Sequence, residues 1–233
     1  MSQSTHAEAD RIRSYFGEAS WRQTDGRRML VDERRRLLAR IARVRLPAVG
    51  ELTVCDVGCG AGADLEHWRS LGVAESRLFG TELVPQLAAA ASGALPNASV
   101  IRVDGFEIPF PDSSFDLVTA SLVLSSIRDP EGRRRMLNEM RRVARPGGLL
   151  AIYDFRIRKP WNRNVVAMSG LELAITLGPP RAEYRLAPFL PLLDLALRLP
   201  APLRGAAVGV LPRTHRLWVW ELPRHDATRG RSS

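Results

Sequence analysis

The densest group of residues that could do chemistry is a short stretch in which three glycines alternate with small residues behind a carboxylate. Asp56 precedes Gly58, Gly60 and Gly62, and the helix-forming segment Ala63–Trp68 follows them. Glycines at a strand-to-helix turn allow a sharp bend and let a ligand approach the backbone amides, while the helix dipole favours negative charge there. A carboxylate at the end of a buried strand is costly unless donors or a cation pair with it. The stretch therefore predicts a binding turn for a ligand that carries both positive and negative charge.

Further polar residues follow at the ends of later apolar runs. Glu82 lies twenty residues after the third glycine, the position at which a carboxylate meets a ribose in dinucleotide-binding folds. Asp104 is followed by Gly105 and Phe106, and an acid next to an aromatic ring can bind an exocyclic amine and cover a flat base. Ser121 ends the next apolar run. Open α/β sheets bind their ligands at such strand ends, so we expect these side chains to share one crevice.

The elements that must position these residues alternate along the chain. Strands are predicted at residues 52–57, 78–82, 99–103, 115–121 and 149–153, and the helices between them at 63–68, 85–92 and 131–143. Five strands alternating with helices predict a Rossmann-like, doubly wound α/β fold with a parallel sheet and right-handed crossovers.

The segments outside this alternation complete the expected organisation. A short helix or loop is predicted at 10–21, helices at 32–44 and 165–177, a sixth strand at 184–186 and an edge strand at 214–221. The apolar but proline-broken stretch 186–211 predicts short amphipathic helices that serve as a substrate cover or as an interfacial patch. We therefore divide the chain into an N-terminal helical cap (1–49), a binding core (50–155), a substrate-covering part that completes the sheet (156–223) and a flexible tail (224–233).

Length and composition restrict the class of protein. A chain of 233 residues can bury one sizeable core. It opens with no signal-type segment and contains no apolar run long enough to span a bilayer, so a soluble, cytoplasmic protein is expected. The two cysteines, Cys55 and Cys59, both lie in the glycine turn. Two ligands make a poor metal site and a disulfide would crowd the turn, so no metal is expected.

The net charge of +9 suggests nucleic-acid binding, but its distribution argues against it. Residues 51–155 carry a net −4, whereas the flanks 1–50 and 156–233 carry +5 and +8. We expect a small-molecule substrate rather than a nucleic acid. The basic flanks also fit peripheral contact with a membrane or with a lipid-linked or phosphorylated substrate. The run Arg34–Arg36 is interpreted as a solvated helix face.

Five motifs, taken together, resemble the ordered motif series of class I S-adenosylmethionine-dependent methyltransferases, of the small-molecule, type 11-like kind. They are Asp56–Gly62, Glu82, Asp104, Phe115–Val118 and Arg145–Leu150. The resemblance covers residues 50–155. One departure is the end of the fourth strand, which often carries histidines in the family and here reads Leu122–Ser126.

This resemblance implies a seven-stranded sheet with a reversed last strand, S-adenosylmethionine as cofactor and specific roles for the residues above. The glycine turn should hold the methionine part and Glu82 the ribose hydroxyls. Leu83 should lie against the adenine, Asp104 should reach its amino group, and Ser121 should line the sulfonium end. The acidic turn suits a positive ligand better than a pyrophosphate.

The implied reaction is methylation of a small molecule, with a hydroxyl of a sugar, lipid-linked saccharide or natural product as the expected acceptor. Such a hydroxyl loses a proton as it attacks, and general-base help is worth about 10²–10⁴-fold. The candidate bases are Asp154 and His215. The alternatives are that Asp154 holds loop amides and that His215 is an ordinary edge-strand histidine. Methylation of nucleic acid or protein, or a catalytically silent cofactor-binding protein, are the other functions considered.

Overall fold

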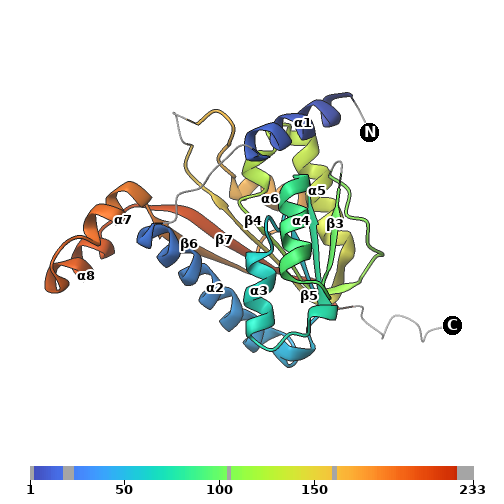
Figure 1. Ribbon diagram of the computed structural model, residues 1–233, viewed down its shortest axis with the longest axis horizontal. Helices are drawn as coiled ribbons and strands as arrows, with labels where there is room; N and C mark the ends of the chain where they lie inside the picture. The colour runs from blue at the N-terminus through green and yellow to red at the C-terminus, as the bar shows by residue number, and fades with distance from the viewer. Residues whose placement is uncertain (1–2, 18–23, 104–105, 159–161, 225–233) are drawn as a thin grey trace.

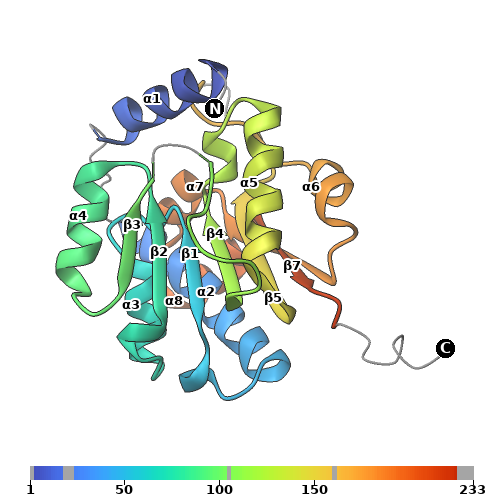
Figure 2. The same ribbon diagram turned by 90° about the vertical axis from the view of Figure 1, so that its right-hand side faces the viewer.

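A seven-stranded sheet in the order β3-β2-β1-β4-β5-β7-β6 forms the centre of the molecule (Figures 1 and 2). The computed structural model describes residues 3–17, 24–103, 106–158 and 162–224. The strands are β1 (Val54–Val57), β2 (Leu78–Glu82), β3 (Ser99–Arg102), β4 (Phe115–Ser121), β5 (Ala144–Phe155), β6 (Ala182–Pro188) and β7 (Arg213–Glu221). Strands β1 to β5 pair in parallel, and β7 runs antiparallel to both β5 and β6. The predicted fold class, with its reversed last strand, is confirmed.

Helices cover both faces of the sheet. They are α1 (Gln3–Gly17), α2 (Asp25–Arg45), α3 (Ala63–Ser70), α4 (Pro85–Ala94), α5 (Pro130–Val143), α6 (Gly170–Leu177), α7 (Leu190–Ala196) and α8 (Ala201–Gly209). One core cluster packs α2, α3, α4 and α7 against one face, and a second packs α1, α5 and α6 against the other. None of the helices within the described ranges is long and apolar enough to cross a membrane.

Three helices begin at places that differ from the prediction. Helix α1 begins at Gln3 rather than at residue 10. Helix α2 begins at Asp25 rather than at residue 32, because the Thr24 side chain accepts a hydrogen bond from the Arg27 N–H at 3.1 Å and caps an extra two turns. Helix α6 begins at Gly170 rather than at residue 165. The preceding residues 165–169 are irregular instead, since the N–H groups of Val166 and Met168 donate to the carbonyls of Ser125 and Phe155.

Helix α1 lies at the edge of the sheet where the parallel strands end. Its Glu8 accepts a hydrogen bond from the Arg128 N–H, and its Arg11 donates to the carbonyl of Ser126, just beyond β4. Tyr15 accepts a hydrogen bond from Asn162 at 3.1 Å. Helix α1 therefore covers this edge of the sheet.

The turn after β1 uses its glycines for their backbone freedom. Gly58, Gly60 and Gly62 all have positive φ, at +67°, +56° and +83°. A Cβ at Gly58 would meet Val123 Cγ2 at 2.5 Å, whereas a Cβ at Gly60 would meet nothing within 4 Å. The turn is therefore tight at its first glycine and open at its second.

This difference predicts unequal costs for two alanine substitutions. Both Gly58→Ala and Gly60→Ala should destabilise the protein by about 1–2 kcal/mol through the left-handed backbone. Only Gly58→Ala should add a packing clash, of about 1–3 kcal/mol. Urea unfolding of the two variants measures the difference, and equal destabilisation would contradict the described packing of Val123.

Candidate functional site

Asp56 ends β1 with a carboxylate that is almost fully buried. Its exposed fraction is 2%, and its Oδ1 accepts a hydrogen bond from the Thr119 hydroxyl on β4 at 2.6 Å. Burial raises the pKa of Asp56 to about 7, the negative charges of Asp64 and Glu82 add to the rise, and Thr119 and Arg34 oppose it. Near neutral pH this group is therefore poised between its neutral and charged forms.

Glu82 ends the neighbouring strand β2 and ties it to the glycine turn. Its Oε2 accepts the N–H of Gly60 at 2.8 Å, and its Oε1 accepts those of Leu83 and Val84, also at 2.8 Å. The carboxylate is 7% exposed. Three backbone donors hold its charge in place, so the sequence prediction that Glu82 belongs to the same crevice as the glycine turn agrees with the geometry.

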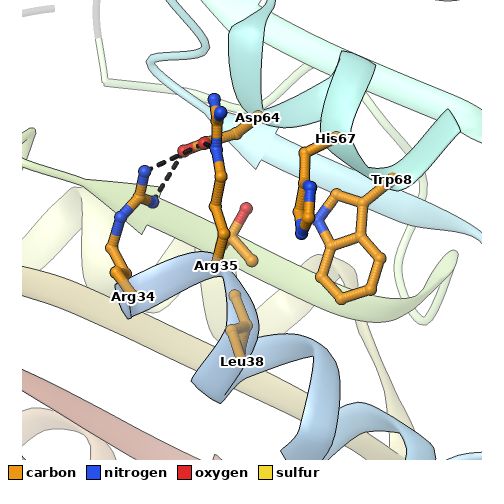
Figure 3. A pocket seen from close by; sticks show the side chains of 7 residues that line it. Arg34, Arg35, Leu38, Asp64, His67 and Trp68 are labelled. Atoms are coloured by element: carbon orange, nitrogen blue, oxygen red, sulfur yellow. Dashed lines mark hydrogen bonds and ion pairs between the residues drawn. The ribbon is translucent and has the colours of Figure 1, made fainter. Parts of the chain in front are cut away.

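A largely buried ion pair joins α2 to this crevice. Figure 3 shows the Arg34 guanidinium facing the Asp64 carboxylate, with Nη1 and Nη2 donating to its two oxygens at 2.6 and 2.9 Å. Arg34 Nη1 also donates to the Ser121 hydroxyl. Burial would raise the pKa of Asp64, but the guanidinium groups of Arg34 and Arg35 outweigh it and hold the pKa well below its usual range. Helix α2 is thereby fixed to α3 and to the end of β4.

The sequence prediction for the run Arg34–Arg36 is wrong for two of its three residues. Arg34 is 7% exposed, and Arg35 donates to Asp64 at 2.8 Å. Arg36 alone is a solvated residue, with a side chain that is 79% exposed. The helical spacing of the leucines beside Arg34 places this arginine on the side of α2 that faces the sheet. That spacing could have identified Arg34 as a buried residue.

His215 lies in a row of stacked groups that leads to Arg34. Its ring is parallel to that of Tyr153, with centroids 5.2 Å apart. The Arg34 guanidinium lies 5.2 Å from the centroid of the same Tyr153 ring. His215 is 8% exposed, and its Nδ1 is 2.9 Å from the Thr214 hydroxyl. The structure thus brings this candidate base near the crevice, and its role in proton transfer stays a prediction.

Asp154, the other candidate base, is fully buried at the end of β5. Its oxygens accept the N–H groups of Ser125 and Phe155 at 2.9 and 2.8 Å. Burial raises its pKa to about 6, against the opposing effect of these hydrogen bonds. This geometry is that of the alternative in which the carboxylate holds loop amides, and a catalytic role for Asp154 stays a prediction.

The residues expected around the adenine are only partly described. Leu83 is 9% exposed in the cluster that also contains residues of α1. Phe106 is 3% exposed, and its ring lies against α5, where a Cβ at Gly132 would meet Phe106 Cε2 at 2.7 Å. Asp104 and Gly105 lie outside the described residues. The roles assigned to all four stay predictions.

The side chains present fit a cationic cofactor of amino-acid and nucleoside parts. The space beside Gly60 is open, and among the described residues the buried carboxylate of Asp56 accepts a hydrogen bond from the Thr119 hydroxyl. Arg34 and Ser121 supply positive charge and a hydroxyl on the opposite side. A small pocket of about 10 Å³ between α2 and α3 is lined by Arg34, Asp64 and Trp68 among others (Figure 3). It has room for about one water molecule, so it is not the cofactor site.

Comparisons with known proteins agree with this arrangement. Residues 55–152 match a family described as a methyltransferase domain. An uncharacterized methyltransferase of Mycobacterium sp. strain JLS is 30% identical over 187 residues, which are 73% of this chain and 69% of that protein. A demethylmenaquinone methyltransferase of Corynebacterium urealyticum is 34% identical over 120 residues, 52% and 49% of the two chains.

The fold comparison points the same way. The S-adenosylmethionine dependent methyltransferase from Mesorhizobium loti superposes with a TM-score of 0.56 at 21% identity, covering 77% of this chain and 95% of that one. This likeness shows the fold. The chain spans about half the length of two curated relatives, 49% of the Corynebacterium protein and 54% of the probable methyltransferase ltbC of Aspergillus luteorubrus, to which it is 28% identical.

The buried ion pair predicts a large loss of stability when one partner is neutralised. Asp64→Asn keeps the shape of the side chain but leaves Arg34 buried without its carboxylate, which should cost about 3 kcal/mol or more. The control is Asp32→Asn on α2, where the pair with Arg36 is exposed and 3.8 Å long; its loss should cost less than about 0.5 kcal/mol. Similar free energies of unfolding for the two variants would contradict the buried pair.

The raised pKa of Asp56 predicts a pH-dependent gain from Asp56→Asn. Between about pH 4 and 7 the unfolded chain loses the Asp56 proton while the folded chain keeps it, so the unfolding free energy of the wild type falls by up to about 1.4 kcal/mol per pH unit. Asn keeps an oxygen for the Thr119 hydroxyl and does not titrate. The stability of the variant relative to wild type should therefore rise across this window and level off above it.

Urea unfolding of the variant and the wild type at several pH values measures this difference in the free energy of unfolding. Other groups, such as Asp154, titrate in both proteins, so their effects cancel in the difference. A relative stability that stays flat from pH 4 to 7 would show that Asp56 ionises normally in the folded protein.

Proposed function

Because the chain belongs to the class I S-adenosylmethionine-dependent methyltransferases, we propose that it binds S-adenosylmethionine and transfers its methyl group to a small-molecule acceptor. The observation that carries the proposal is the buried Asp56 carboxylate with a pKa of about 7, which lies in one crevice with Glu82 and the glycine turn. An acidic, poorly hydrated pocket favours a ligand with a positive centre.

The residues of the crevice have distinct roles in holding the cofactor. Asp56 attracts the positive charge, and Glu82 accepts a ribose hydroxyl at the one lone pair of Oε2 that remains beyond its three amide bonds. Gly60 provides the open backbone surface. Arg34, held by Asp64 and next to Ser121, faces the carboxylate of the amino-acid part. Hydrogen bonds to charged groups of this kind are worth about 1.5–3 kcal/mol each.

Alignment and exclusion of water supply most of the catalysis. When bound, S-adenosylmethionine would supply a methyl group on a positive sulfur: an acceptor oxygen would bond to the methyl carbon in line with the breaking carbon–sulfur bond, and the sulfur would leave as a neutral thioether. The cap formed by α1 and α2 covers the strand ends and keeps water from the crevice. His215 is the proposed base, because it lies beside Tyr153 at the crevice and is 8% exposed, whereas Asp154 is 0% exposed.

For the acceptor we propose a hydroxyl of a sugar, a lipid-linked saccharide or a natural product. The acidic core, with a net charge of −4 over residues 51–155, supports a small acceptor over a nucleic acid. The name of the Corynebacterium relative, a demethylmenaquinone methyltransferase, is that of an enzyme for a small acceptor. A lipophilic quinol therefore belongs among the acceptors to be tested.

The direct test is transfer of a labelled methyl group from S-adenosylmethionine to a panel of glycosides, phenols and quinols. The wild type should methylate at least one of them. Glu82→Gln should lower kcat/KM for the cofactor by about tenfold or more, mainly through KM, since a charge-assisted hydrogen bond is lost.

The matched control is Glu66→Gln on α3, whose carboxylate pairs with Arg69 at the surface and which should leave kcat/KM unchanged. Transfer to RNA, DNA or protein but to no small molecule would overturn the proposed acceptor class. Cofactor binding without transfer to any acceptor would favour a silent binding protein.

A further inference from the structure

The helices α7 and α8 carry large apolar side chains into solvent. Figure 1 shows the pair extending away from the rest of the molecule. Leu192 and Leu195 on α7 are 42% and 60% exposed, and Leu203 and Val210 at α8 are 57% and 83% exposed. A soluble surface seldom gathers this much apolar area without a partner.

The exposed side chains lie on defined faces. Leu193 and Ala196, at 0% and 5% exposure, fix one side of α7 to the body, and the three-residue spacing of Leu192 and Leu195 places both on the adjoining, exposed side. Helix α8, whose residues are all described, has no buried residue. Leu203 and Val210 are seven residues apart, two helical turns, and so share a face.

The charge around these side chains is positive. Arg198 and Arg204 are exposed between and along the two helices, and Arg28 is exposed on the neighbouring first turns of α2. The acidic residue of the pair, Asp194, accepts the Gly26 N–H at 3.1 Å and is thereby turned toward α2. Apolar side chains flanked by arginines complement an anionic interface with an apolar interior.

The pair also lies at the functional edge of the sheet. Strand β6 runs in the same direction as β5, because both are antiparallel to β7, and α7 follows directly after the end of β6. The ends of β5 and β6 share their edge with the glycine turn. A surface that docks through α7 and α8 would therefore face the side of the molecule on which the crevice opens.

We propose that α7 and α8 dock onto the surface of an anionic phospholipid bilayer, with the leucines in the headgroup region and the arginines paired with lipid phosphates. The docking does not depend on the cofactor or the acceptor. Together with the proposed function it would select acceptors that reside in or on the membrane.

The test is co-sedimentation of the full chain with vesicles, without cofactor or acceptor. Vesicles made of equal parts of phosphatidylcholine and phosphatidylglycerol should bind the wild type, and vesicles of phosphatidylcholine alone should bind it at least roughly tenfold more weakly. The double variant Leu195→Glu/Leu203→Glu should lower the binding to anionic vesicles by about tenfold or more. Arg198→Gln/Arg204→Gln should do so by roughly tenfold as well and should weaken the salt dependence.

The matched control is Leu171→Glu/Ile175→Glu on α6, where the two side chains are 72% and 77% exposed on the opposite face of the sheet. This control should bind like the wild type, and circular dichroism checks that every variant is folded. No binding to anionic vesicles, equal binding to both kinds of vesicle, or equal loss in the α6 control would overturn the proposal. So would a concentration-dependent dimer, seen by light scattering, that the α7–α8 variant abolishes while vesicle binding persists.

Discussion

The cost of keeping the Asp56 carboxylate inside the protein shapes the rest of the site. Burial raises its pKa to about 7, and within the described part of the chain a short hydrogen bond reaches it from Thr119. An aspartate in this position lowers stability near neutral pH, where an uncharged side chain would not. Groups that reduce stability in this way cluster at functional sites, because there the charge serves a ligand. This is the reason for proposing that a positive group of the ligand lies beside Asp56.

The positive charge of Arg34 offsets part of the cost of burying the Asp56 carboxylate, and Arg34 also positions helix α2 of the N-terminal cap. Its bonds to Asp64 and Ser121 join α2 to α3 and to the end of β4, and its position over the Tyr153 ring connects it to His215. A buried guanidinium needs these partners, because its desolvation is otherwise uncompensated. The same pair therefore sets the charge of the crevice and the placement of the helix that covers it.

Local patterns in the sequence predicted the parts of the structure that local forces determine. The glycine turn, the strand ends at Asp56 and Glu82, and the alternation of strands and helices follow from spacing, and the parallel sheet follows from them. The burial of Arg34 depends on Asp64 and on Ser121, 87 residues away, so a charge run read by itself suggested a solvated face. The start of α6 likewise depends on hydrogen bonds from the residues before it to Ser125 and Phe155.

The most direct test of a cationic ligand beside Asp56 is the proton released when S-adenosylmethionine binds. Calorimetric titrations at pH 7 in two buffers of different ionisation enthalpy measure that proton. A positive ligand lowers the pKa of Asp56 from about 7, so the wild type should release up to about 0.5 proton per site. The Asp56→Asn variant should release measurably less and bind more weakly. Equal proton release and equal affinity in the two proteins, or no binding heat at all, would contradict the account.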